Sequence, residues 1–406
     1  MIKPENLPHT SSAITPCSKK NRTRIYGWWV ALVVAAAFVL VPYARCIAKR
    51  GDLTSLIRFG RDFASRVVPV LRDRPHYVYP GPGFDGQFYV QLSTDPLLLK
   101  PETAPALDNV MVRAHRILLP IVTWLLSGGS PGLVLWVYPL LNLVAWIALA
   151  VMAWRILPRT GVGGPAAFLA IVLGPGAVES ASRALSDLPA FVLAFASLSV
   201  PTLGGAVLLA LAGLGRETVW LAWPARQSFD GPWWSHWRRW MLDGVITVAP
   251  LALWMISLQL RFWSDSRVDD SYLGLPLSGV MSRFGEMTAQ ISTRPLSSVA
   301  DLVLHPAMQS GMLILSMLAQ FIYLVLRPQK QEAIWRWGLL SGVFVLCLSW
   351  STWEAFYTVT RHLLPLHMAF NLLLVKASHP RSHRWMWFAL GNLYAIPRVL
   401  MWISFP

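Results

Sequence analysis

A glycine-rich segment from Tyr77 to Pro96 holds the residues of this sequence best suited to chemistry. It reads YVYPGPGFDGQFYVQLSTDP, and its glycines and prolines predict a tight bend that presents Asp85 between two aromatic residues. A carboxylate on such a bend near a membrane can act as a general base or a metal ligand, because burial raises its pKa toward a useful value. Alternatively, Asp85 caps its own backbone in an Asx turn. Spacing alone leaves both interpretations open.

Basic residues form the second candidate group. Arg113, His115 and Arg116 lie just before an apolar segment, and Arg361 and His362 lie in a short connector farther along the chain. Arginine binds phosphate through paired hydrogen bonds, which makes Arg361 the stronger candidate of its pair. The alternative is positional, since basic side chains at helix ends extend toward the membrane surface without binding a ligand.

An acidic turn, ESASRALSD, runs from Glu179 to Asp187. Glu179 or Asp187 is a possible second acid that joins Asp85 around a divalent cation or a substrate hydroxyl. The alternative is a helix N-cap, because Ser186 and Asp187 come directly before Leu188 and a proline. We favour the cap for at least one of the two acids.

The composition shows which elements must position these residues. Of the 406 residues, 55% are hydrophobic and 14% are charged, whereas soluble domains carry about 25% charged residues. Segments such as Tyr26 to Ala44, Leu133 to Trp154 and Met241 to Trp263 approach the roughly 20 apolar residues that a membrane-crossing helix needs. The sequence therefore predicts an all-α, polytopic transmembrane protein.

The charge distribution argues against a nucleic-acid partner and for one orientation. The net charge is +15, but most lysines and arginines lie in short connectors beside apolar runs, as the positive-inside rule describes. The basic residues between Lys19 and Arg24 precede the first apolar run, which predicts a retained anchor and a cytoplasmic N-terminus. The three cysteines form neither a zinc motif nor a disulfide framework.

We predict about 9 to 11 membrane segments, counted from apolar runs of suitable length. The expected parts are a cytoplasmic basic tail over 1–25, a transmembrane module over 26–377 and a C-terminal membrane segment over 378–406. Extracytoplasmic loops are expected over 45–116 and 264–311, the second with an amphipathic surface helix. The expected spans after the first are Leu133 to Trp154, Val162 to Val178, Leu188 to Val200, Met241 to Trp263, Met312 to Leu326, Ile334 to Trp350, Leu363 to Val375 and Trp385 to Ile403.

Two apolar stretches are too short to cross singly. Ile117 to Leu126 is predicted to lie in the interface or to re-enter the membrane. Ala206 to Leu214 and Val219 to Trp223 flank Arg216 and Glu217, which predicts a bent pair with two charges at depth. Charges there are costly unless they face protein or a watery cavity. With these exceptions, every short basic connector falls on one side and the polar candidates fall on the other.

These residues carry a resemblance to a known superfamily. The runs GFDGQFYVQLSTDP, DNVMVRAHRILLPIVTWLLSGG, ESASRALSDLPA, LAGLGRETVWLAWPA and TRHLLPLHMAF occur in order. They resemble bacterial membrane proteins of cell-surface glycopolymer formation, within the C-type (GT-C) glycosyltransferase superfamily. The resemblance implies a polyprenyl-phosphate sugar as donor and a catalytic acid in the first outer loop, where Asp85 lies. That loop has one acid here rather than an adjacent acidic pair, so the use of a divalent cation stays open.

The leading hypothesis is an integral membrane glycosyltransferase of the bacterial inner (plasma) membrane. It would move a sugar to a glycan, lipid or protein acceptor on the extracytoplasmic face. Asp85 would deprotonate the acceptor, and Arg113, His115, Arg116, Arg216 and Arg361 are the candidates for holding the phosphate. A transporter or flippase for lipid-linked saccharides is the alternative, although no inverted repeat is evident in the sequence. A non-catalytic assembly subunit is a third possibility.

Overall fold

The computed structural model describes residues 19–158, 163–227, 236–262, 272–293, 304–378 and 380–403. Most of them are helical. Within these ranges the strands are β1 (Phe59–Gly60) and β2 (Val78–Tyr79), which pair in parallel with Phe59 opposite Val78. This two-stranded sheet is a small correction to the all-α expectation. It joins the start of the first loop to the segment that leads into Asp85.

Five helical segments in the described part of the chain are long and apolar enough to cross a membrane. They are Tyr26–Arg50 within α1 (Lys19–Arg50), α7 (Pro131–Ile156), Gly163–Ser182 formed by α8 (Gly163–Val172) and α9 (Pro175–Ser182), α13 (Trp237–Phe262) and α16 (Pro306–Leu326). Shorter apolar helices are α6 (Leu118–Ser127), α10 (Asp187–Ser197), α11 (Thr202–Gly215), α17 (Ala333–Leu346) and α20 (Leu364–Lys376). The chain therefore has the architecture of a polytopic helical membrane protein.

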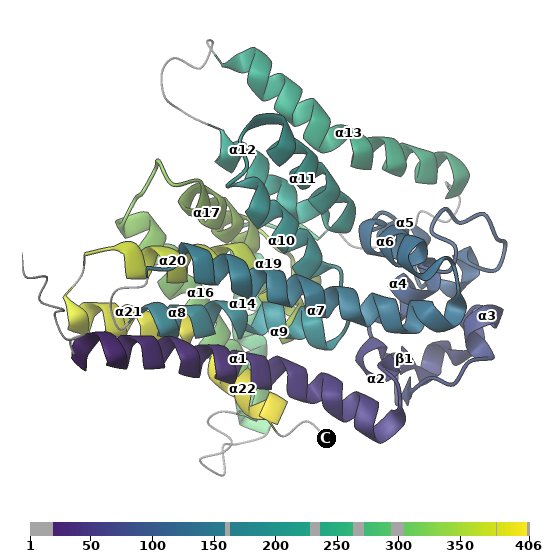
Figure 1. Ribbon diagram of the computed structural model, residues 1–406, viewed down its shortest axis with the longest axis horizontal. Helices are drawn as coiled ribbons and strands as arrows, with labels where there is room; N and C mark the ends of the chain where they lie inside the picture. The colour runs from purple at the N-terminus through teal and green to yellow at the C-terminus, as the bar shows by residue number, and fades with distance from the viewer. Residues whose placement is uncertain are drawn as a thin grey trace, which may run out of the picture.

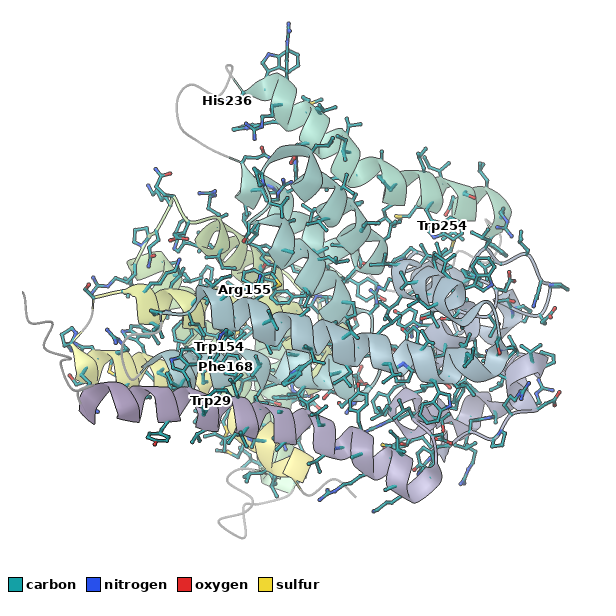
Figure 2. All side chains as sticks on the ribbon, viewed as in Figure 1. Trp29, Trp154, Arg155, Phe168, His236 and Trp254 are labelled. Atoms are coloured by element: carbon teal, nitrogen blue, oxygen red, sulfur yellow. The ribbon has the colours of Figure 1, made fainter. Side chains whose placement is uncertain are left out.

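The outermost helices expose apolar faces. α1 and α13 run along opposite edges of the molecule (Figure 1). In the most apolar 18-residue stretch of each helix, only 22% is buried for α1 and 17% for α13. On α1, the buried Trp28 packs against Trp154 with ring centroids 4.7 Å apart, whereas the neighbouring Trp29 is exposed. Trp154 and Phe168 lie beside α1 in Figure 2. Exposed apolar faces of this length suit a lipid environment rather than water.

Several expected spans are shorter or broken in the structure. Leu188 to Val200 becomes α10, which has 11 residues. Trp385 to Ile403 divides into α21 (Arg381–Asn392) and α22 (Ala395–Ile403), and the side chain of Asn392, the last residue of α21, bonds to that of Asn371. The Asn371–Asn392 pair depends on tertiary packing, which hydropathy does not report.

The two stretches that were predicted not to cross singly fold as expected. α6 has ten residues, too few for the roughly 20 that a span needs. α11 ends at Gly215, Arg216 is extended, and the chain continues as the 3₁₀ helix η3 (Glu217–Leu221) and α12 (Ala222–Arg226). The predicted bend at Arg216 is therefore confirmed.

The first expected loop is a compact unit of short elements. α1 continues to Arg50, so the first residues of the stretch expected as a loop are helical. It contains α2 (Thr54–Ile57), β1, the 3₁₀ helix η1 (Arg61–Arg66), α3 (Pro69–Arg72), β2, α4 (Gly86–Leu92), the 3₁₀ helix η2 (Ala104–Ala106) and α5 (Val110–Ala114). Apolar side chains from this unit pack on Leu135 and Tyr138 of α7. The unit gathers at one end of the molecule (Figure 1).

The second expected loop, 264–311, holds α14 (Ser278–Thr293), in the place of the predicted surface helix. Residues 264–271 and 294–303 of that loop lie outside the described residues, as do residues 1–18 of the expected basic tail. α1 begins at Lys19 and α16 begins at Pro306, so both helices extend beyond the apolar runs that predicted them. The remaining elements are α18 (Trp350–Trp353) and α19 (Phe356–His362).

Candidate functional site

Five charged side chains from distant parts of the chain meet in one cluster. Asp85 precedes α4, Arg113 lies in α5, Asp187 begins α10, Arg216 follows α11 and Arg361 lies in α19. We call these five residues the charged cluster. It forms where the first-loop unit meets the ends of helices from the later part of the chain.

Alternating charges connect the members of the charged cluster. Arg113 lies 3.0 Å from one carboxylate oxygen of Asp85, and Arg361 donates to the other at 3.1 Å. The same Arg361 nitrogen lies 3.3 Å from Asp187, whose second oxygen pairs with Arg216. Arg361 therefore lies between two carboxylates, where the sequence allowed for a divalent cation. In the described part of the chain, no group of three or more histidine, cysteine or acidic side chains could hold a metal ion.

A second group lies beside the charged cluster and centres on Glu217. Its carboxylate is 3.0 Å from Arg116 and 3.1 Å from His115. Arg116 also donates to the hydroxyl of Tyr89 at 3.1 Å. Arg116 and His115 are therefore held by an acid next to Arg216, and they do not contact Asp85 directly through a hydrogen bond.

The Asx-turn interpretation of Asp85 is wrong. Its side chain makes no capping hydrogen bond at the start of α4, and both oxygens face arginines instead. Burial acts to raise the pKa of Asp85, but the charges of Arg113 and Arg361 outweigh it and hold that pKa well below its usual range. In this arrangement Asp85 is an ionised carboxylate.

Tight backbone contacts fix the bend that carries Asp85. Gly83 has a φ of +73°, a conformation that favours glycine. Gln87 donates to the carbonyl of Pro82 at 2.8 Å and accepts from the amide of Gly60 at 2.8 Å, which ties the bend to β1. A Cβ on Gly86 would lie 2.6 Å from the carbonyl oxygen of Arg183. The glycines therefore allow the backbone next to Asp85 to pack closely on its neighbours.

Replacing Gly86 by alanine is expected to destabilise the protein by about 1 to 3 kcal/mol, because the added methyl group must displace backbone rather than a flexible side chain. Gly132→Ala is the matched control, since a Cβ there meets no atom within 4 Å. Thermal unfolding in one detergent measures both variants. Equal melting temperatures for the two would show that the contact at Gly86 is not tight.

The two acids of the Glu179 to Asp187 turn have different environments. Asp187 belongs to the charged cluster, so the N-cap interpretation is wrong for its side chain. The amide of Leu188 instead donates to the hydroxyl of Ser180 at 2.9 Å. Glu179 is buried in α9 and pairs with Arg183 at 2.6 Å. The structure therefore brings Asp187, but not Glu179, into an ion pair shared with Asp85.

Aromatic rings border the charged cluster. The guanidinium of Arg183 lies 3.8 Å from the ring centre of Phe84 and 4.6 Å from that of Tyr357. Tyr357 also lies within 6.0 Å of Arg361 and remains 37% exposed. Partly exposed aromatic faces beside charged groups provide apolar contact area next to a polar site.

A cavity of only about 20 Å³ lies against Asp187, Arg216, Arg361 and His362. Such a volume holds about one water molecule. Burial, reinforced by the charges of Arg216 and Arg361, keeps the pKa of His362 well below its usual range, so its ring is neutral and accepts from Arg216 at 2.8 Å. A phosphate cannot enter this space unless the ion pairs rearrange. Asp85, whose side chain is 26% exposed, is the most exposed member of the charged cluster.

The sequence pointed to most of the residues that converge here, including His362 as a weaker candidate than Arg361, but missed two. Glu217 and Tyr89 were not among the site candidates, although each bonds to a residue that was. The signal for Glu217 was available, because it follows Arg216 at the break between two apolar halves. No family model, no curated protein and no solved structure matches this chain.

Proposed function

We propose that the protein is a GT-C-type membrane glycosyltransferase of the bacterial inner membrane. It transfers a sugar from a polyprenyl-phosphate-linked donor to a cell-envelope glycan, lipid or protein acceptor on the extracytoplasmic face. The observation that carries the proposal is the charged cluster, in which Arg113 and Arg361 grip one carboxylate, Asp85, at the end of apolar helices. In this proposal the shorter apolar helices complete the set of about 9 to 11 membrane segments.

The donor phosphate competes with Asp85 for its arginines. Guanidinium groups bind phosphate at least as readily as carboxylate, through the same paired geometry. When Arg113 and Arg361 turn to the phosphate, Asp85 loses the charges that depress its pKa and gains a negative neighbour. Both changes raise its pKa. Donor binding thus converts a weakly basic carboxylate into a useful base.

The reaction then needs one proton transfer and one displacement. Asp85 takes the proton from the acceptor hydroxyl, and the acceptor oxygen forms a bond to the anomeric carbon of the sugar. The bond from that carbon to the phosphate oxygen breaks, and polyprenyl phosphate leaves with the electron pair. Arg361 and Arg113, supported by Arg216, stabilise the negative charge that develops on the phosphate. Arg116 and His115, which pair with Glu217 beside the charged cluster, are the remaining candidates for contact with the phosphate.

Purified protein in liposomes tests the proposal directly. With a polyprenyl-phosphate donor that carries a radiolabelled sugar, we expect label to pass to an added acceptor and free polyprenyl phosphate to accumulate in equal amount. Protein-free liposomes are the control. Movement of intact donor between leaflets, with no cleavage, would instead identify a flippase and contradict the enzyme assignment.

A further inference from the structure

A second basic site lies at the end of α1, apart from the charged cluster. A cavity of about 340 Å³ separates the last turns of α1 from the first-loop unit. This volume is within the range of about 300 to 1,000 Å³ that is usual for small-molecule sites. Its walls include Arg45, Lys49, Arg50, Arg58, Tyr77 and Tyr79. The reaction proposed for Asp85 uses none of them.

One wall is a single face of α1. Pro42, Arg45, Cys46 and Lys49 all line the cavity, and their spacing of three and four residues places them on one side of a helix. Arg45, Cys46 and Lys49 follow the apolar run that ends at Ala44. Basic residues at such a helix end lie at the level of the lipid headgroups. The tendency of basic side chains at a helix end to extend toward the headgroups would explain the cations of α1. It would not explain the basic and aromatic side chains on the other side of the cavity.

The opposing wall is built from the first-loop unit. Arg58 is only 5% exposed and adopts a left-handed backbone conformation with a φ of 59°. Its guanidinium lies 5.6 Å from the ring centre of Tyr79, and that of Arg50 lies 4.0 Å from the ring centre of Tyr77. The fold therefore places a buried cation and two aromatic rings across from the basic face of α1.

The charge of the lining is entirely positive. Four of the residues that line this cavity are arginine or lysine, and no carboxylate side chain is among the described residues that line it. Burial, and to a smaller extent the nearby charge of Arg183, lowers the pKa of Arg58 to about 10. An anion in the cavity would be attracted by the four cations that line it.

We infer that this cavity binds the phosphate headgroup of a membrane lipid. The headgroup contacts the basic residues and the two tyrosines, and the acyl chains leave past Pro42 along the exposed apolar face of α1 at Val41 and Ile47. We assign the bound phosphate group to a membrane lipid rather than to free phosphate, since the cavity lies where a candidate membrane span ends at Arg50. The inference does not depend on glycosyl transfer at Asp85.

Native mass spectrometry of the full-length protein in detergent tests this site with short-chain phosphatidylglycerol as the probe. The variant Arg45→Gln, Lys49→Gln, Arg50→Gln removes three exposed cations from the cavity. We expect it to bind this lipid roughly 10- to 100-fold more weakly than wild type, from the usual contribution of each cation near an anionic membrane surface. The control variant Arg61→Gln, Arg66→Gln, Arg74→Gln removes three exposed arginines of the same loop unit that do not line the cavity, and it should bind like wild type.

Four results would overturn the inference. Equal affinity of the cavity variant and wild type would exclude the site, and an equal loss in the control variant would show general attraction to basic surface. Diacylglycerol with the same chains tests the phosphate itself, and binding as tight as that of phosphatidylglycerol would mean that the chains are recognised. Inorganic phosphate is the last competitor in the experiment. Displacement of the lipid by millimolar phosphate, with no preference for the lipid, would identify a free-anion site.

Discussion

Replacing Asp85 by asparagine is expected to slow sugar transfer by about 10²- to 10⁴-fold, the usual contribution of a general base. The amide has nearly the shape of the carboxylate but cannot accept the acceptor's proton. The fold should survive, because each arginine keeps another acid. Arg113 retains Asp108 at 2.6 Å, and Arg361 retains Asp187 at 3.3 Å.

Asp62→Asn is the matched control for this experiment. Asp62 is an exposed acid in η1 of the same loop unit, and its replacement should leave the rate of transfer unchanged. The measurement is the initial rate of label transfer at saturating donor, with the melting temperature of each variant in the same detergent. Full activity of the asparagine variant would show that Asp85 is not the general base. Loss of activity with a matching loss of melting temperature would assign Asp85 a structural role.

The long helices and the bend at Arg216 could be predicted from the sequence because both depend on local composition. A run of about 20 apolar residues needs little tertiary information to be recognised as a span. In the same way, Arg216 and Glu217 interrupt two apolar halves, and the chain does leave the helix there. The division of the segment between Arg381 and Ile403 was missed, although Pro397 in the first turn of α22 cannot continue a helix that runs through Leu393.

The site shows the same division between local and tertiary information. Counting spans placed Asp85, Asp187 and Arg361 on one side of the membrane, and the structure brings their side chains into contact. Their pairing could not be predicted, because Asp85 and Arg361 are 276 positions apart. Local rules were misleading at both acids. An aspartate in a glycine-rich bend and one at a helix start each match a capping pattern, yet both carboxylates pair with distant arginines.

Asp187→Ala should have the largest effect on stability, a loss of about 3 to 5 kcal/mol. It removes the carboxylate shared by two buried arginines, Arg216 and Arg361. Arg361 keeps Asp85 as a partner, but the remaining hydrogen-bond partners of Arg216, Thr218 and His362, are neutral. A buried guanidinium without a facing carboxylate is costly, since it has lost water and gained no counter-charge.

A surface ion pair supplies the comparison. Glu332 lies 3.0 Å from Lys376, and their side chains are 42% and 34% exposed. Glu332→Ala should therefore change stability by about 1 kcal/mol or less. Thermal unfolding of both variants in one detergent gives the two losses side by side. If Asp187→Ala melts no earlier than Glu332→Ala, the ion pairs of Asp187 are not buried from water as the structure has them.

Replacing Arg216 together with Asp187 distinguishes an effect on stability from an effect on sugar transfer. The double variant Asp187→Ala, Arg216→Met should recover most of the melting temperature lost in Asp187→Ala, because apolar groups of similar volume replace buried ion pairs at little cost. Transfer activity should not recover with it. Arg216 supports the phosphate in the proposed reaction, and methionine offers no hydrogen bonds to an anion. Recovery of both properties together would mean that Arg216 and Asp187 contribute only to stability. Arg113 and Arg361 would then be sufficient to bind the phosphate.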